Sequence, residues 1–489
     1  MSFSRYNLRS SKRNQKGSAL VYALVILAIV MIILVSMLTY ISAQLKFSFN
    51  RVEKERAFQT AEAGIYYYRW YLAHETSGKT AQQISDFWEG GTAIGVSSPY
   101  ESEYEGIGKY KVEVDAPDSG STIVTVKSTG WTYKMPNITR TVQVRFRRPS
   151  WSEYMWVVND FINFGTGAEV YGKVHSNIGI LFNGLAHNVV SCLVPSFNDP
   201  THGGSYLDFG VHTHQVPADP AAPAYPWPDG TVPDRPDIFM GGRQFPIPEV
   251  SFSGILSDLG NMKSEAQGGH GKYFDATGAG RRIILKSDGT YDICTVDSYH
   301  HTAYYITSYL KNSGTGTCSS CSEDCLSNYP ILNDRIIFVE NNAWVEGTVN
   351  NKRVTIAAAN LSGGPLANIY IGLNDRGTGN IRYTNYDCNN IIGLVAQQNI
   401  SIVRDCPDNF VVDAALLAQS GRISRGNYAI NRSTLTFNGA LASYLQPYFN
   451  TGNNGFGIRT YNFDNNLLYC PPPYFPTGTE YSIDLWEEL

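Results

Sequence analysis

The chain has 489 residues, which is enough for two or three domains with their own hydrophobic cores. Its formal net charge is −5, but the first 17 residues contain five basic and no acidic residues. The remainder therefore carries 33 basic against 43 acidic residues, a net charge of −10. Since no long basic stripe follows, we expect no nucleic-acid partner. The 32 tyrosines and 45 glycines favour β-structure with many turns. We call the first 17 residues the leader. Its basic residues are Arg5, Arg9, Lys12, Arg13 and Lys16.

An uncharged, mostly apolar run of 28 residues extends from Ser18 to Leu45. It exceeds the roughly 20 residues that cross a bilayer core. A cleaved secretory signal has a shorter apolar region, about 7–15 residues, with a small-residue cleavage site behind it. Here Gly17 lies before the run. The run therefore predicts a membrane-spanning helix, and the basic leader predicts a cytoplasmic N-terminus with the rest of the chain outside.

The helical pattern continues beyond the apolar run, to about Ala73. Apolar residues recur there at or near three- and four-residue spacing, which predicts one face that packs against another element. A single helix from residue 18 to about 73 would be about 80 Å long at 1.5 Å per residue. A simple anchor does not need such an extension. The apolar positions are Val52, Phe58, Ala61, Ile65 and Tyr68.

The leader ending in Lys16-Gly17, the helix starting at Ser18 and the stretch "AFQTAEAGI" resemble a type IV prepilin, most closely the PilX-type minor pilins and their GspK-type relatives. The resemblance covers residues 12–70 and includes the motif Ala61, Glu62, Ala63, Gly64. It implies that a membrane peptidase cuts after Gly17 and that the new N-terminal Ser18 is N-methylated. It also implies that the apolar half-helix joins the filament core, with major and minor pilins and the assembly platform as partners. An uncleaved single-span anchor is the alternative.

Tyr22 departs from the pattern of this family. The fifth residue of a mature pilin is usually Glu, which is thought to pair with the N-terminal amine of a neighbouring subunit. A buried charge is costly unless it is paired, so this contact sets register during assembly. A subunit without it suits the start of a filament better than the repeated shaft, and GspK-type members share the lack. Tyr22 therefore favours an initiating or tip position.

Residues 75–150 contain three runs with alternating apolar and polar residues, "GKYKVEVD", "STIVTVKS" and "TRTVQVRF". They predict a small antiparallel sheet whose apolar face is covered by the second half of the long helix. The preceding residues, 75–104, are predicted as a connecting loop with a short helix near "AQQISDFW". A helix laid on such a sheet is the head arrangement of pilins.

Residues 151–489 read as short apolar runs closed by Gly or Asn, such as "VYGKVHSNIGILFNG" and "NIIGLVAQQNISIV". No strict period is present. The pattern favours an irregular right-handed β-helix, with a β-sandwich as the alternative. The fold class predicted for the whole chain is thus α+β, mainly β. Its parts are the leader 1–17, the helix 18–74, the pilin-like sheet 75–150 and a large β-rich domain 151–489.

Seven prolines lie within residues 217–237, a segment that cannot be a central strand because Pro lacks an N–H donor. We expect it to run along the outside of the large domain. A helix is predicted after it, at about 252–266, and "RRIILKSDGTYDICTV" is predicted as a hairpin with Asp-Gly at the turn.

Eight cysteines in an extracytoplasmic domain favour disulfides over metal binding. "CSSCSEDC" lacks the second ligand pair of a zinc site. Cys388 and Cys406 enclose 17 residues and form a plausible local bridge, while the remaining pairing is left open. The candidates are Cys192, Cys294, Cys318, Cys321, Cys325, Cys388, Cys406 and Cys470.

No catalytic or cofactor site is predicted. His202, His212 and His214 are expected to lie in an exposed loop without convergent ligands. Calcium could bind the oxygen-rich "NDRGTGN" (374–380), but the acidic ligands are too few, which favours a plain turn. The carboxylates that a polysaccharide-cleaving β-helix would need form no recognisable pair. These are Asp160, Asp208, Asp375 and Asp413.

The sequence therefore predicts a non-enzymatic minor pilin, inserted in the inner membrane with its C-terminus outside and then assembled at or near a filament tip. The large domain could bind a surface or a glycan. Two alternatives remain, an anchored adhesin that never enters a filament and a tethered polysaccharide-active enzyme.

Overall fold

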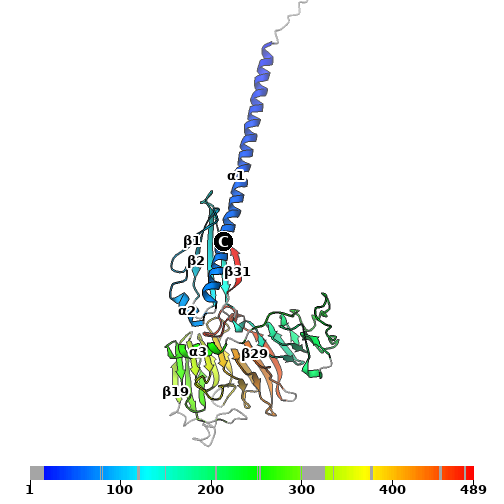
Figure 1. Cartoon of the computed structure of the whole chain (residues 1–489), viewed down its shortest axis with the longest axis vertical. Helices are drawn as coiled ribbons and strands as arrows, with labels where there is room; N and C mark the ends of the chain where they lie inside the picture. The colour runs from blue at the N-terminus through cyan, green and yellow to red at the C-terminus, as the bar shows by residue number, and fades with distance from the viewer. Residues whose placement is uncertain are drawn as a thin grey trace, which may run out of the picture.

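The computed structural model describes most of the chain. The described residues are 16–77, 79, 81–117, 122–148, 150–203, 206–250, 252, 255–297, 299, 325–333, 335–374, 378–450, 454–477 and 481–489. They form a long N-terminal helix, a small antiparallel sheet packed on its second half, and a large strand-rich domain at the far end of that helix (Figure 1). The described part of the chain is mainly β.

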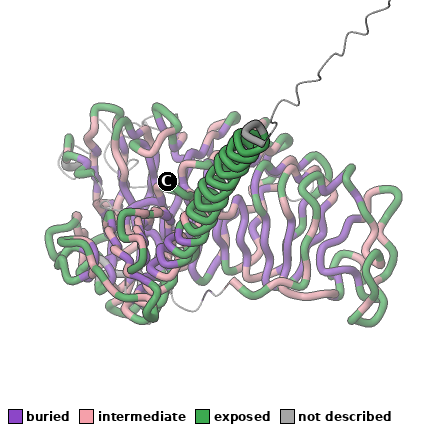
Figure 2. The backbone as a smooth tube through the Cα atoms, turned by 90° about the horizontal axis from the view of Figure 1, so that it is seen from above, coloured by how far each residue is buried: buried purple, intermediate pink, exposed green. Residues whose placement is uncertain are grey.

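Helix α1 (Lys16–Thr76) has 61 residues, about 90 Å at the rise of an α-helix. Figure 2 shows its projecting part exposed on every side, with burial beginning only where the helix reaches the rest of the molecule. The continuous helix predicted from Ser18 to about Ala73 is therefore confirmed. Its length follows from a run of strong helix formers with no Pro and a single interior Gly, Gly64.

The second half of α1 lies on a five-stranded antiparallel sheet with strand order β1-β2-β3-β4-β31. Buried and half-buried positions alternate along its three central strands, as the sequence predicts. A short helix, α2, closes one end of the core that α1 and the sheet share. The bounds are α2 (Ala81–Glu89), β1 (Tyr100–Tyr104), β2 (Gly108–Asp115), β3 (Ile123–Thr132), β4 (Thr139–Arg147) and β31 (Ser482–Glu488).

Strand β31 is the last strand of the chain, and it pairs with β4 rather than with the large domain. The C-terminus consequently lies beside α1 (Figure 1). The expectation that all of 151–489 belongs to one C-terminal domain was wrong for residues 482–488. The loop predicted for 75–104 also ends in an edge strand, β1. The large domain is thus inserted between two neighbouring strands of the small sheet.

Within the large domain, ten strands pair side by side in one parallel ladder. The order in space differs from the order in sequence, because β29 pairs with the much earlier β5. In spatial order the strands are β16 (Gly271–Phe274), β20 (Arg335–Val339), β22 (Arg353–Ala358), β25 (Ile391–Ala396), β27 (Asn409–Ala418), β29 (Asn431–Ser443), β5 (Trp156–Val158), β8 (Val174–Ser176), β11 (Val190–Cys192) and β15 (Arg243–Gln244).

Three further parallel ladders accompany this one. The first contains β17 (Gly280–Leu285), β21 (Asn342–Val349), β23 (Ile369–Ile371), β26 (Ile400–Ile402) and β28 (Ile423–Arg425). The second contains β24 (Ile381–Tyr383), parts of β27 and β29, β30 (Gly455–Phe463), β7 (Ala168–Tyr171) and β10 (Leu185–Ala186). The third contains β6 (Ile162–Phe164), β9 (Ile180–Phe182) and β14 (Val211–His212). Short strands with tight corners are confirmed.

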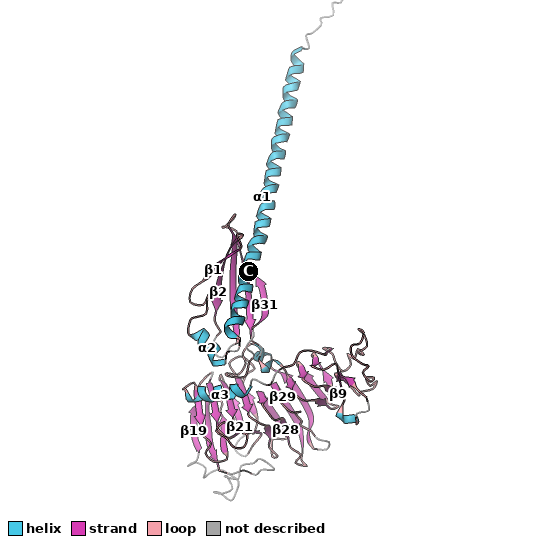
Figure 3. Ribbon diagram, viewed as in Figure 1, coloured by secondary structure: helices cyan, strands magenta, loops and turns pink. Residues whose placement is uncertain are grey.

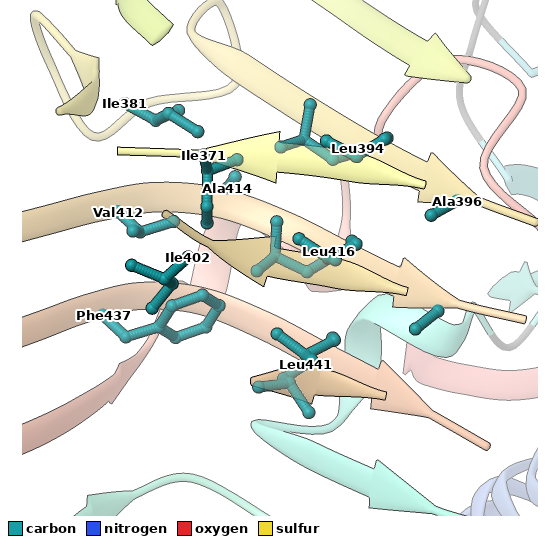
Figure 4. Close-up of a cluster of buried hydrophobic side chains, with 14 of the residues drawn as sticks. Ile371, Ile381, Leu394, Ala396, Ile402, Val412, Ala414, Leu416, Phe437 and Leu441 are labelled. Carbon is teal, nitrogen blue, oxygen red and sulfur yellow. The ribbon is translucent and has the colours of Figure 1, made fainter. Parts of the chain in front are cut away.

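Side chains at equivalent register positions stack along the inside of the ladders (Figure 4). Leu394 pairs in register with Leu416, which pairs with Leu441, and all three are almost fully buried. Such columns remove apolar surface from water at about 25 cal/mol per Å². Asparagines form a column of their own at one corner, where Asn368 Nδ2 donates to Asn342 Oδ1 and Asn399 Nδ2 donates to Asn368 Oδ1, at 3.3 and 2.9 Å. These contacts explain the recurrent Asn at strand ends.

The remaining elements surround the ladders. Helix α3 (Ile255–Gln267) covers the outer face of the ten-strand ladder. Its bounds are close to those of the helix predicted at about 252–266. Strand β18 (Thr290–Val296) forms the predicted antiparallel hairpin with β17 and pairs on its other edge with β19 (Cys325–Pro330). The proline-rich segment 217–237 forms no strand and is mostly exposed, as expected. The other short elements are η1 (Trp151–Glu153), β12 (Ser196–Phe197), η2 (Pro200–His202), β13 (Asp208–Phe209) and η4 (Asn465–Leu468).

Cys388 is bonded to Cys470, with an S–S distance of 2.10 Å, so the local Cys388–Cys406 bridge was wrong. Cys406 is buried in the core and 1% exposed, whereas Cys388 lies at a half-exposed turn. The two cysteines are separated because β25 and β26, which lie between them in the chain, belong to different ladders. Cys192 is also a buried free thiol, and Cys294 is disulfide-bonded. Cys318 and Cys321 lie outside the described residues, as does the side chain of Cys325.

Candidate functional site

The first half of α1, residues 19–49, exposes apolar side chains on all sides, with Lys46 as its one charged residue. We call these residues the apolar cylinder. Its large hydrophobic side chains are between 47% and 69% exposed. By length and composition, α1 is the one helix among the described residues that could cross a membrane, and its most apolar window has a mean hydropathy of 3.1. Exposed apolar surface of this extent marks a membrane or protein interaction site. Gly17 and Ser18 lie in the first turn of α1, and their side chains are outside the described residues.

Tyr22 lies on the apolar cylinder and is 69% exposed. A phenol on an apolar surface can accept a hydrogen bond from an amine, but it is not a carboxylate. The position therefore offers neither a carboxylate nor an ion pair to a neighbouring helix.

The second half of α1 buries a stripe of residues against the small sheet. Ala57, Ala61, Ile65, Tyr68 and Leu72 are at most 2% exposed. This spacing of three or four residues confirms the packed face predicted from the sequence. Val52 was assigned to that face wrongly, because it is 45% exposed and its neighbour occupies the buried position of the stripe.

That neighbour is Glu53, which is only 4% exposed. Its Oε2 accepts a hydrogen bond of 2.7 Å from Thr132 Oγ1 on β3, and its Oε1 accepts one of 2.9 Å from Arg56 Nη1. A buried carboxylate is tolerated when it has such partners. Glu53 was not predicted from the sequence. The one available signal was its spacing of four residues before Ala57, which places it on the buried face of the helix.

The motif 61–64 lies where α1 and the sheet approach most closely. A Cβ atom on Gly130 of β3 would lie 2.3 Å from Ala61 N and 2.4 Å from Ala57 O. A Cβ on Gly64 would lie 2.2 Å from Ser128 Oγ. Glu62 and Ala63 are half-buried beside this contact. Small residues here let the helix backbone contact the strand backbone directly. This contact fixes the angle between the apolar cylinder and the head, the name we give to the second half of α1, α2 and the small sheet.

Strand β31 holds this head together from the C-terminal end. Asp484 bonds Arg145 Nε at 2.7 Å, and the ring of Trp486 contacts Phe58 of α1 edge-on at 5.8 Å. Just before the strand, Tyr481 accepts a hydrogen bond of 3.0 Å from Trp88 Nε1, and burial raises the pKa of this phenol. The three contacts connect β31, with the residue just before it, to β4, α1 and α2, respectively.

The carboxylates considered for catalysis have structural partners. Asp413 is fully buried and accepts hydrogen bonds from Tyr386 OH and Asn438 Nδ2 at 2.9 and 2.7 Å. Asp160 accepts from the backbone N–H groups of Phe161 and Gln446 at 2.8 and 3.1 Å. Asp375 and the centre of the considered calcium stretch lie outside the described residues. Asp208 belongs to a histidine cluster treated below.

Comparison with known proteins supports the interpretation of the helix. Residues 16–65 match the model of the PilX N-terminal family. A search of curated proteins finds no match. The competence-associated pilin ComZ from Thermus thermophilus is a similar solved structure, with 13% identity, a TM-score of 0.29, and coverage of 89% of this chain and 97% of its own. A similarity with so low a TM-score supports no functional argument.

The matched residues contain both halves of α1 that the structure distinguishes, the apolar cylinder and the start of the stripe that packs on the sheet. In its N-terminal segment, residues 16–65, the chain is thus similar to the PilX N-terminal family.

Proposed function

We propose that this protein is a minor pilin subunit of a type IV pilus or related filament, located at or near the tip. The observation that carries the proposal is the apolar cylinder, exposed on all sides and rigidly continuous with a packed head. A helix that is hydrophobic all round requires a membrane or a bundle of similar helices. Both environments occur in the life of a pilin, first the inner membrane and then the filament core.

Processing follows from the same proposal. A membrane-embedded peptidase removes residues 1–17 on the cytoplasmic side, and Ser18 becomes the N-methylated start of the mature chain. The large domain lies outside the cell. Partners are major and minor pilins, the peptidase and the assembly platform. Tyr22 supports an initiating position, since the first subunit needs no carboxylate for the amine of a preceding one.

The form of the large domain also favours the tip. We propose that its parallel ladders wind as an irregular right-handed β-helix, which the stacked registers and short strands support. A domain of about 330 residues inserted in each head would crowd a shaft in which subunits repeat at close spacing. A single copy at an end meets no such restriction.

Immunogold labelling of isolated filaments tests the assignment. With an antibody to the large domain, we expect gold at one filament end, and we expect N-terminal sequencing of the filament-bound chain to begin at Ser18. Label confined to the membrane, on a chain that begins at Met1, would instead identify an anchored adhesin. Label repeated along the shaft would contradict the tip position while retaining the pilin assignment.

A second function, adhesion through the large domain, is supported by a cleft of about 340 Å³ where β5 and β30 meet. Trp156 Nε1 and Asn450 Oδ1 are buried there without a hydrogen-bond partner. A ligand with hydroxyl groups could satisfy both, and aromatic rings provide the apolar contact that sugars need. The lining includes Trp156, Asn163, Tyr448, Asn450, Arg459 and Tyr461.

Glycan-array binding by the detergent-solubilised chain tests this second function. Replacing Arg459 with Ala is expected to weaken binding of any captured glycan about tenfold, the cost of one charge-assisted hydrogen bond. Lys173→Ala removes an exposed cation elsewhere on the same domain and serves as the control. Equal binding by both variants would exclude this cleft as the glycan site.

A further inference from the structure

Five titratable side chains converge near β9 and β14, at the opposite end of the large domain from β19 (Figure 3). The sequence predicted exposed, incidental histidines here, and this was wrong: His212 is 1% exposed. The five form two overlapping triads that share one histidine, and the potential ligand atoms of each triad lie within 4.8 Å of one another. One triad is Asp199, His212 and His214, and the other is His202, Asp208 and His214.

Short, well-bonded elements hold these residues. Asp199 is the N-cap of η2 and accepts hydrogen bonds from Thr201 N and Thr201 Oγ1 at 2.8 and 2.9 Å. His212 belongs to β14, which pairs in parallel with β9. Its ring also contacts Phe197 at a centroid distance of 5.4 Å. These contacts fix the positions of the Asp199 carboxylate and the His212 ring, as a preformed ligand site requires.

Contacts within the cluster bring imidazole nitrogens to carboxylate oxygens. His212 Nε2 lies 3.1 Å from Asp199 Oδ2, and His214 Nε2 lies 3.5 Å from the same oxygen. His202 Nε2 lies 2.5 Å from Asp208 Oδ2. The side chains of Asp199 and Asp208 are 0% and 4% exposed, so two carboxylates are held in a nearly dry site.

The cluster leaves hydrogen-bonding capacity unused. His214 Nε2 is buried and has no hydrogen-bond partner, although it faces Asp199 Oδ2. His212 Nδ1 is buried and unpartnered as well. Buried nitrogens without partners are rare and call for a ligand or another explanation.

We propose that Asp199, His212 and His214 bind a divalent transition-metal ion of the zinc class, with the His202–Asp208 pair beside it. Two imidazoles and one carboxylate are the donor set that zinc prefers, whereas calcium and magnesium prefer oxygen ligands alone. Three protein ligands leave a coordination position for water or for a group on a bound partner. The ion would link η2 to β14 and so stabilise the end of the domain.

Titration of the detergent-solubilised full chain with zinc sulfate, after treatment with a chelator, tests the proposal. We expect one zinc ion per chain and an increase in thermal midpoint on zinc addition. In His214→Ala, affinity is expected to fall by roughly 100-fold, and the thermal increase should disappear. His214 is 33% exposed, so its removal leaves the core intact. The control is His270→Ala, which removes an exposed histidine paired with Glu265 outside the cluster.

Asp199→Asn distinguishes the two triads, because Asp199 belongs to only one of them. The amide keeps an oxygen for the hydrogen bond from Thr201 N while losing the charge. We expect it to weaken zinc binding at least about tenfold. Loss of affinity in His214→Ala but not in Asp199→Asn would overturn the assignment of Asp199. Absence of stoichiometric zinc binding by the wild-type chain, or equal affinity in His214→Ala and His270→Ala, would overturn the site altogether.

Discussion

The Gly17→Val chain is expected to retain residues 1–17 and to be absent from filaments. Under the proposed function, the peptidase must bring the 17–18 peptide bond into its active site at the membrane surface. A β-branched side chain there adds bulk and stiffens the backbone where the family has Gly. Intact-mass measurement of the membrane-bound chain should show the leader still attached, and filament preparations should contain at least about tenfold less of the variant.

Ala19→Val provides the matched control for processing. It places the same side chain two residues later, on the exposed face of the same helix, without changing the residue before the cleaved bond. We expect normal cleavage and normal incorporation. If Gly17→Val were cleaved at the wild-type rate, the prepilin interpretation of the leader would fail. If it remained uncleaved but still entered filaments, cleavage would not be the step that admits this subunit.

Gly130→Val is expected to detach α1 from the small sheet. The new Cβ would lie within 2.4 Å of two backbone atoms of α1, and neither helix nor strand backbone can move aside as a side chain can. Overpacking typically costs about 1–3 kcal/mol, and we expect the upper end of that range here because both clashing partners are backbone atoms. Hydrogen–deuterium exchange measures the effect locally: amides of β3 and of residues 53–72 should exchange faster in the variant, while those of β25 and β27 should not change.

Gly165→Ala controls for the general cost of replacing a glycine. Nothing lies within 4 Å of a Cβ at that position, and its backbone has no positive φ. Its exchange should match wild type throughout. Unchanged protection of β3 in Gly130→Val would show that the close approach of α1 and β3 does not determine the stability of the head.

Elements with a local signal could be predicted from the sequence. The charge-free run and its helical continuation predicted α1, and alternation over eight to ten residues predicted β2, β3 and β4. Asp288-Gly289 between two apolar runs predicted the β17–β18 hairpin, which the structure confirms. In each case, the residues that decide the structure are neighbours along the chain, so that propensity and periodicity suffice.

The features that the sequence did not reveal depend on contacts between distant residues. The segment "SIDLWEE" gives no indication that it pairs with 142–147, and Cys470 gives none that it bonds Cys388. Glu53 looks like a surface residue until Thr132 is placed opposite it. Asp199 and Asp208 look like loop residues until β14 brings two histidines to them. Chain topology, rather than local pattern, creates all four.

The pairing of β31 with β4 joins residues that follow the large domain to a head whose other strands precede it in the chain. The small sheet has an open edge at β4 until residues 482–488 have been made, because these residues form its fifth strand. Contacts of such sequence separation form late and slowly. A chain interrupted anywhere in its large domain therefore never completes the surface on which α1 rests. Completion of the head thus requires that the chain has been made as far as residue 488.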